Sequence, residues 1–407
     1  MKIALDPSPL REYPLYRRIF LGQMVSFFGS QITYVALPWQ LYHLTNSTFD
    51  VGLLGLAQLF PLIIMGIWGG AIADAVERKW ICISVMSLLA VCNGVLIALT
   101  VTNHVTPAAI YLLGGLMAGL SSLYRPAFQS LIPQLVKRED LPRISPLNSF
   151  TSTFGMIAGP AVGGVLLSSV GIAWTYVVDL GTYLFAIFMM FGLPRIQVPG
   201  GDNVRITFKA IKEGLSYAVS RKDLLGTYLV DMISMSLAFP NPLFPALAAT
   251  IAGEDKVGWY YSATAVGAFL GTMTSGWTPS RVRHGMIITI AATGWGIGIA
   301  FFGLTVNYFI PSLLFLLAAG WSDMISGIFR GTVWNQTIPQ DRRGRLASVE
   351  MLSYASGPLI GNSLMGFMVD AWGIATALMI GGTMAAVGCF ILGRLLKPFW
   401  YYRAPVI

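Results

Sequence analysis

The sequence predicts an all-α membrane protein of twelve transmembrane helices, arranged as two pseudo-symmetric six-helix bundles with both termini in the cytoplasm. Composition, the placement of the basic residues and an internal repeat support this fold class. The 407 residues are 55% hydrophobic and only 11% charged, and the mean hydropathy is +0.67. Because a soluble domain of this composition lacks the polar residues to cover its surface, we expect the lipid bilayer to be its solvent.

The basic residues are placed asymmetrically along the chain. All but three of the 26 lysines and arginines lie at the termini or in every second gap between apolar stretches, and the exceptions are Arg125, Lys256 and Arg330. This bias is the positive-inside pattern of membrane proteins with many spans. The isoelectric point near 9.4 therefore reflects topology, and we expect no nucleic-acid partner.

Twelve apolar stretches are long enough to cross a bilayer core of about 30 Å, which takes about 20 helical residues. In chain order, we expect helices at 18–44, 50–73, 80–102, 107–136, 142–169, 172–193, 222–251, 256–279, 284–305, 310–338, 345–369 and 373–396. The longest polar gap follows the sixth stretch and holds a short amphipathic pattern, FKAIKEGLSYAV. We therefore expect an N-terminal bundle at 1–195, a cytoplasmic linker at 196–221 and a C-terminal bundle at 222–407.

The first helices already show features that recur in the second half. The first 18 residues form a mainly polar stretch, and the apolar run that follows is a full span, so we expect the first helix to be retained and not cleaved as a signal peptide. The second and eighth helices begin with the same pair, Val51-Gly52 and Val257-Gly258. The fourth ends RPAFQSLIPQ, from Arg125 to Gln134, and the tenth ends RGTVWNQTIPQ, from Arg330 to Gln340. Both thus carry an arginine and then Ile-Pro-Gln, with one residue inserted in the second copy.

The fifth and eleventh helices share a glycine-proline motif. Gly159-Pro160 with Gly163 in the fifth is matched by Gly357-Pro358 with Gly361 in the eleventh. Small residues allow helices to approach closely, so we expect these positions to serve packing or bending. Two parallel six-helix repeats are typical of transporters whose bundles move around a central site.

Ionisable residues inside the apolar stretches are the best pointers to chemistry, because each costs several kcal/mol unless it is paired or faces water. They are Arg125, Asp179, Asp231, Asp323 and Arg330. Asp323 and Arg330 are seven residues apart and thus share one face of the tenth helix. A permanent ion pair between Asp231 and Arg330, with no part in turnover, is the alternative to a functional role.

Two segments resemble a known family. The stretch GAIADAVERK (Gly70 to Lys79) resembles the loop between helices 2 and 3 of the major facilitator superfamily, and the Gly155, Gly159-Pro160 and Gly163 pattern resembles the helix 5 motif of its proton antiporters. The N-terminal stretch PLYRRIFLGQMVSFFGSQ is most similar to the group that contains the enterobactin exporter and the macrolide efflux proteins. Ala75 and Glu77 depart from the loop pattern, and Ser280 stands where the repeat predicts an Asp.

The resemblance implies roles for the residues singled out above. Helices 1, 4, 7 and 10 line the central cavity in this superfamily, which would bring together Gln31, Arg125, Asp231, Asp323 and Arg330 as groups for substrate binding or proton coupling. Asp179 is a further coupling candidate on a helix that usually supports the bundle. Gating would involve Gly70, Asp74, Arg78, Lys79 and Glu350. The alternative is that Asp74 only caps a helix and that Arg78 and Lys79 only obey the topology rule.

No pattern of an enzyme or a metalloprotein is present. His43, His104 and His284 lie at or near the ends of three different expected helices, far apart along the chain, and no phosphate-binding loop of the GxxxxGK[ST] type occurs. We expect no cofactor and no metal. Three functions remain: a proton-coupled exporter, a passive facilitator or importer, and a non-transporting scaffold or receptor.

Buried carboxylates favour a proton-coupled transporter, since their protonation can bias two conformations differently. The resemblance implies outward transport. We expect a monomeric bacterial inner-membrane exporter of a small amphipathic molecule, such as a siderophore or a drug, that works by alternating access in exchange for protons.

Overall fold

The computed structural model describes residues 6–75, 77–194, 216–217, 219–280, 283–338 and 343–403, without the side chains at 67–75, 138, 278–280, 343–352 and 355. These ranges are mainly helical and contain no β-strand, only an isolated bridge between Arg283 and Arg403. Ten helices among them are long and apolar enough to cross a membrane. The predicted all-α membrane fold class is confirmed, and two of the twelve expected spans remain predictions.

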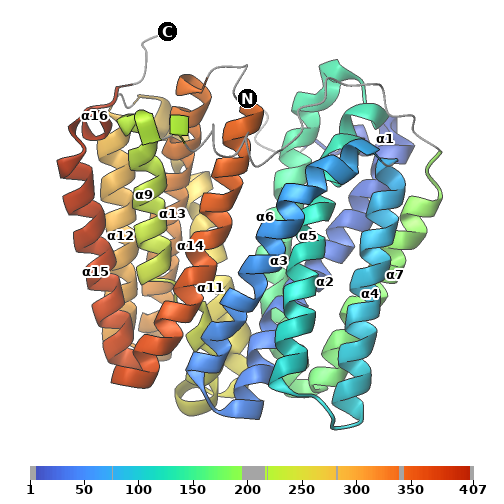
Figure 1. The fold of residues 1–407 in the computed structure, drawn as a ribbon, viewed down its shortest axis with the longest axis horizontal. Coiled ribbons are helices and arrows are strands. Elements are labelled where there is room, and N and C mark those ends of the chain that lie inside the picture. The colour runs from blue at the N-terminus through green and yellow to red at the C-terminus, as the bar shows by residue number, and fades with distance from the viewer. Residues whose placement is uncertain are drawn as a thin grey trace. The chain divides into compact units, whose positions relative to one another are not determined.

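The long helices lie close to the predicted positions (Figure 1). In the first half they are α2 (Pro14–Thr45), α3 (Thr48–Ala75), α4 (Arg78–Val101), α5 (Pro107–Leu135), α6 (Leu141–Ser169) and α7 (Ile172–Phe191). In the second half they are α9 (Lys222–Leu237), α11 (Val257–Met273), α12 (His284–Leu304), α13 (Phe309–Thr337), α14 (Arg343–Trp372) and α15 (Ile374–Leu395). Two short helices, α1 (Ser8–Glu12) and α16 (Lys397–Trp400), lie near the chain ends.

The seventh expected span is not one continuous α-helix. After α9 the chain forms a 3-10 turn (Asn241–Leu243), the short helix α10 (Phe244–Leu247) and a π-helical turn (Ala248–Ala252). Pro240, Pro242 and Pro245 explain the break, because each lacks an N–H donor and restricts the residue before it. By length and apolarity the whole stretch still qualifies as one span, Lys222–Ala252.

Two helices fall outside the ten apolar spans. The α11 helix has only 17 residues and is followed by a 3-10 segment, Ser275–Ser280, where the sequence predicts helix to residue 279. The α14 helix has 30 residues, but the side chains of its first turns lie outside the described part. Both helices occupy positions where the sequence predicts a span.

The helices form two compact units. The first contains residues 1–40 and 60–205, and the second contains residues 41–59 and 206–407. Each unit pairs its helices in the same way: α4 packs against α5 and α7 in the first, and α12 packs against α13 and α15 in the second. The third helix of each predicted repeat therefore contacts the fourth and the sixth, as an internal repeat requires.

Residues 41–59 group with the second unit because the beginning of α3 packs tightly on α14. The Ser363 hydroxyl donates a hydrogen bond to the Gly52 carbonyl at 2.8 Å. A methyl group on Gly366 would lie 3.1 Å from the Gly52 Cα, so both positions allow the two backbones to approach closely. The predicted bundle boundaries at residues 195 and 221 stay a prediction.

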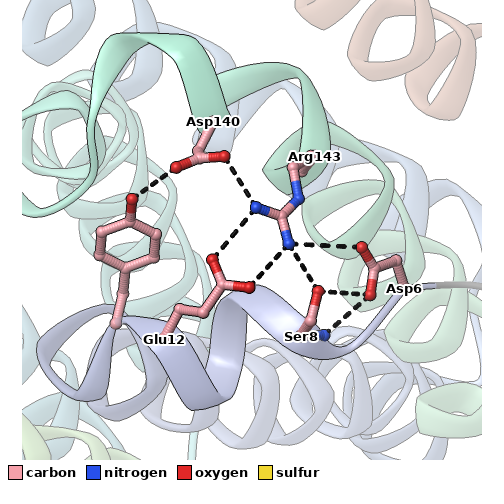
Figure 2. Close-up of polar contacts among 6 residues, drawn as sticks. Asp6, Ser8, Glu12, Asp140 and Arg143 are labelled. Carbon is pink, nitrogen blue, oxygen red and sulfur yellow. Dashed lines mark hydrogen bonds and ion pairs between the residues drawn. The ribbon is translucent and has the colours of Figure 1, made fainter.

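The N-terminal segment is fastened within the first unit by Arg143 (Figure 2). The guanidinium donates to Glu12 at 2.9 Å and 3.1 Å, to Asp140 at 2.8 Å and to the Ser8 hydroxyl at 2.6 Å. The Tyr13 hydroxyl donates to the other oxygen of Asp140 at 2.5 Å. Asp6 forms a further ion pair with Arg143 at 3.6 Å. These contacts join the N-terminal segment and α1 to the start of α6, and we call the group the N-terminal latch: Asp6, Ser8, Glu12, Tyr13, Asp140 and Arg143.

Candidate functional site

The second unit contains a buried cluster of three charged residues. Arg330 on α13 forms an ion pair with Asp231 on α9. It forms a second ion pair, at 3.5 Å, with Asp323, which lies on the same helix as Arg330. Arg330 and Asp231 are almost fully buried, whereas 36% of the Asp323 side chain is exposed. One positive charge thus lies between two negative charges of unequal exposure.

Helical geometry explains how these residues meet. Asp323 and Arg330 are seven residues apart, so both side chains project from the same face of α13, as the sequence predicts. Asp231 lies in α9, in the stretch before the proline break, and the Arg330 guanidinium is its ion-pair partner. The Nε atom of Arg330 is buried without a hydrogen-bond partner among the described residues, which leaves one donor of the cluster unused.

Aromatic side chains cover one side of Arg330. Its guanidinium carbon lies 5.5 Å from the ring centre of Tyr354 on α14. Trp334 packs edge-on against Tyr354 and stacks on Tyr228, with ring centres 5.4 Å apart in both pairs. The Trp334 ring nitrogen donates to the Thr227 hydroxyl at 2.9 Å. Arg330 is therefore covered by a packed aromatic group in which Tyr354 is the exposed member.

The first unit holds the other predicted ionisable residues. Asp179 on α7 is fully buried and accepts hydrogen bonds from neutral side chains only, among the residues that the structure describes. Arg125 on α5 is exposed, and no ion pair or hydrogen bond of its side chain occurs in the described part. Gln31 on α2 is half-buried beside Gly159. Shared lining of one cavity by residues of both units remains a prediction.

The predicted gating residues are only partly described. Gly70 and Asp74 belong to α3 and Glu350 to α14, but their side chains lie outside the described residues. The Arg78 guanidinium donates to the Ser130 carbonyl on α5 at 3.2 Å. Lys79 is buried and donates to the carbonyls of Phe191, at 3.3 Å, and Leu193.

Lys79 therefore caps the end of α7 within the first unit. A cation at a helix C-terminus satisfies carbonyls that have no partner in the helix and interacts favourably with the helix dipole. Stabilising the end of α7 is thus a structural role that Lys79 can have without any part in gating. The gating role of the whole set stays a prediction.

The glycine-proline motifs lie where two helices touch. In the first unit, a methyl group on Gly159 of α6 would lie 2.5 Å from the Gln31 Cβ on α2, and Gly155 lies against Phe27. Gly163 is in ordinary contact distance of Ile32. Pro160 lies inside α6. The motif therefore lets α6 approach α2 closely.

The matching motif does the same in the second unit. A methyl group on Gly357 of α14 would lie 3.0 Å from the Met235 Cβ on α9, and Gly361 contacts Met235 and Phe239. Pro358 lies inside α14. The fifth helix thus packs on the first and the eleventh on the seventh at these glycines. A hinge function stays a prediction.

Sequence reasoning missed the polar partners of Asp179. The residue that it overlooked is Asn93 on α4, which donates to Asp179 at 2.7 Å. A visible signal existed: Asn93 and Thr100, like Thr33 and Gln40, are polar residues seven apart inside an apolar stretch. Such spacing places both members of a pair on one helix face, although it does not reveal which helix they meet.

Ten apolar helices, a charged cluster inside one bundle and a buried carboxylate inside the other define a membrane transporter of the major facilitator type. Residues 6–401 match the family described as transmembrane secretion effector, and the chain belongs to this family. It is a transporter and not an enzyme. With its membrane spans and its bacterial relatives, it is a multi-pass protein of the bacterial inner membrane.

Known proteins resemble this chain over nearly its whole length. The enterobactin exporter EntS of Salmonella typhi is 28% identical over 401 residues, which cover 96% of this chain and 94% of that protein. Among solved structures, a variant of the nucleoside transporter NupG has a TM-score of 0.78 at 13% identity, with 95% of this chain and 100% of that chain covered. A D-xylose-proton symporter has a TM-score of 0.71 at 15% identity, with 93% and 97% covered. At these identities the two structures establish the fold alone.

Proposed function

We propose that this protein is a secondary active exporter. It moves a small amphipathic molecule, a siderophore or a drug-like compound, across the bacterial inner membrane by alternating access in exchange for protons. The similarity to the enterobactin exporter supports the outward direction and the class of substrate.

The observation that carries this proposal is the cluster of Asp231, Arg330 and Asp323. It has one net negative charge if all three groups are ionised, and such a charge is unfavourable in a membrane interior unless a ligand or a proton balances it. Asp323 is the exposed member, so a hydrogen-bond donor or a cationic group of the substrate would bind there. The exposed ring of Tyr354 offers an apolar surface beside Arg330.

Exchange for protons requires a carboxylate whose protonation favours one conformation over the other. Three carboxylates inside spans of this chain, Asp179, Asp231 and Asp323, offer that chemistry. A passive facilitator would not need them to change protonation, and this difference separates the two functions by experiment.

The test measures flux in proteoliposomes with the purified protein. Enterobactin is the first probe, because relatives at 28% identity carry that substrate in their name, and a macrolide is the second. We expect an imposed pH gradient to accelerate the transport of at least one probe in the direction opposite to the proton flow. An uncoupler, which dissipates the gradient, should abolish this acceleration. Liposomes without protein are the control.

Two other outcomes would contradict the proposal. Flux that ignores both the pH gradient and the membrane potential would identify a passive facilitator. Metabolite profiling of culture medium that finds no difference between deletion and overexpressing strains, together with absent flux of both probes, would favour a scaffold or receptor.

A further inference from the structure

Asp179 is a buried carboxylate held by neutral donors alone. Its Oδ2 atom accepts hydrogen bonds from the Thr33 hydroxyl at 2.5 Å and from the Asn93 amide at 2.7 Å. Its Oδ1 atom accepts from the Thr182 hydroxyl at 3.1 Å. The donors come from α2, α4 and α7, so three helices of the first unit converge on one carboxyl group.

No positive charge balances this group within the described part of the chain. Every ion pair there involves other carboxylates. The titratable groups that face Asp179 are the phenols of Tyr176 and Tyr183 on its own helix, and Cys92 on α4 lies beside Tyr183. Asp231, by contrast, is fixed by the Arg330 guanidinium.

The surroundings support both protonation states of Asp179. Burial opposes an isolated negative charge, while three hydrogen bonds from neutral donors stabilise it. Among the described residues, the Asn93 Oδ1 atom is buried without a hydrogen-bond partner. If the Asn93 amide turns over, this oxygen can accept the proton of a protonated Asp179, because an amide carries donors on one side and an acceptor on the other.

A second polar layer connects this site with one end of the first unit. The Tyr176 hydroxyl donates to Gln40 at 2.8 Å, and the Gln40 amide donates to Thr100 at 2.9 Å. Thr100 is half-buried near the end of α4. By the charge pattern this end faces the outside.

The helical spacing aligns the two layers. Gln40 follows Thr33 by seven residues on α2, Thr100 follows Asn93 by seven on α4, and Tyr176 precedes Asp179 by three on α7. These spacings keep each pair on one helix face. The two polar layers therefore follow one another along the bundle, from Thr100 to Asp179.

We infer that Asp179, with Thr33, Asn93 and Thr182, is the proton-binding site of this transporter, loaded through Thr100, Gln40 and Tyr176. A proton from the outer water forms an O–H bond with the carboxylate, and the same bond breaks when the proton leaves to the inner water, with no electron transfer. Coupling of this step to export depends on the proposed function. A sodium ion fits less well, since Thr33 and Asn93 turn hydrogens toward the carboxylate, and the Thr182 hydroxyl shares its hydrogen between the carboxylate and the Asp179 backbone carbonyl at 2.7 Å. Within the described part of the chain, no second carboxylate pairs with these residues.

Infrared difference spectroscopy of the purified protein tests the site without any substrate. In the wild-type protein we expect the carbonyl band of a protonated carboxylic acid, with an intensity that changes with pH. The band should be absent in Asp179→Asn and present at a shifted frequency in Asp179→Glu. Asp323→Asn is the matched control and should keep the band. Asn93→Leu should keep the band at a shifted frequency, and it tests the site even if Asp179→Asn does not fold.

A pH-dependent band that survives in Asp179→Asn, or that disappears only in Asp323→Asn, would overturn the inference. Displacement of the band by sodium, but not by choline, would also overturn it in favour of a sodium site. Gradient-driven enterobactin flux is measured in parallel. If wild-type flux ignores the gradient, the proposed exchange fails, while the band still decides whether Asp179 binds the proton.

Discussion

At Arg330 a single guanidinium compensates two carboxylates, and burial determines what each pair contributes. Asp231 is buried with the arginine, so loss of either partner leaves an uncompensated charge in the interior of the bundle. Asp323 is partly exposed and its ion pair is longer, so water or a ligand can replace that contact.

We therefore predict that Arg330→Gln destabilises the protein by about 3–5 kcal/mol. The double variant Asp231→Asn with Arg330→Gln should recover most of this loss, because it removes both charges. Thermal unfolding in detergent measures the difference. Equal destabilisation of the single and double variants would show that the loss comes from packing and not from the unpaired carboxylate.

Asp323→Asn should behave differently. Its ion pair is partly exposed, so we expect a stability change of less than about 1 kcal/mol. If the substrate binds to this carboxylate, affinity should fall about tenfold, which corresponds to about 1.4 kcal/mol. Binding of the probe to the purified variant is compared with Asp370→Asn, an exposed carboxylate at the end of α14. Unchanged affinity would remove Asp323 from the substrate site.

At the scale of the helices, two features stabilise the first unit: the close packing of α6 on α2 and the N-terminal latch that holds α1. Gly159 allows α6 to touch α2, whereas Gly181 on α7 has open space where a side chain would begin. Gly159→Ala should destabilise the protein by about 1–3 kcal/mol through overpacking. Gly181→Ala is the matched control, with a change of at most about 1 kcal/mol. Equal unfolding temperatures of both variants would contradict a packing role for the motif.

The N-terminal latch should open at low pH and lose one hydrogen bond at high pH. The hydrogen bond from Tyr13 and then that from Arg143 lower the pKa of Asp140, and hydrogen bonds from Ser8 lower the pKa of Asp6. Carboxylates with a lowered pKa stabilise the latch above their ordinary value of 3.8 and lose this effect as the pH falls below it. The hydrogen bond to Asp140 raises the pKa of Tyr13, so that contact weakens as the pH rises above 10.0.

A spin label at Leu10 can follow this opening. The label should be immobile at pH 7 and become mobile below about pH 4, where the carboxylates take up protons. Arg143→Gln should be mobile already at pH 7. A second label at Val170, far along the chain from the latch, reports whether the bundle itself persists. Mobility that does not depend on pH would show that the ion pairs do not hold α1.

At the scale of the whole molecule, the sequence was sufficient to predict the features that depend on the length of apolar stretches and on helical periodicity. Apolar stretches of about 20 residues predicted the helices, because the bilayer leaves few alternatives. The spacing of Asp323 and Arg330 predicted their shared face. The partners of Asp179 and of Lys79 could not be predicted, because they depend on which faces of distant helices meet. The proline cluster indicated an interruption after α9 but not its 3-10 and π-helical form.

The last prediction concerns the orientation of the chain in the membrane. The positive-inside pattern places the loops at Val170 and Asn307 outside and the positions Lys137 and Lys397 inside. All four residues are exposed, whereas the native cysteines Cys82, Cys92 and Cys389 are buried. An impermeant thiol reagent added to intact cells should therefore label single cysteines at Val170 and Asn307 and leave those at Lys137 and Lys397 unlabelled until the membrane is opened. The same reagent should leave the unsubstituted protein unlabelled. The reverse pattern would place the basic loops outside, and would direct the polar layers from Thr100 to Asp179 toward the cytoplasm, where they could not admit a proton from the outer water.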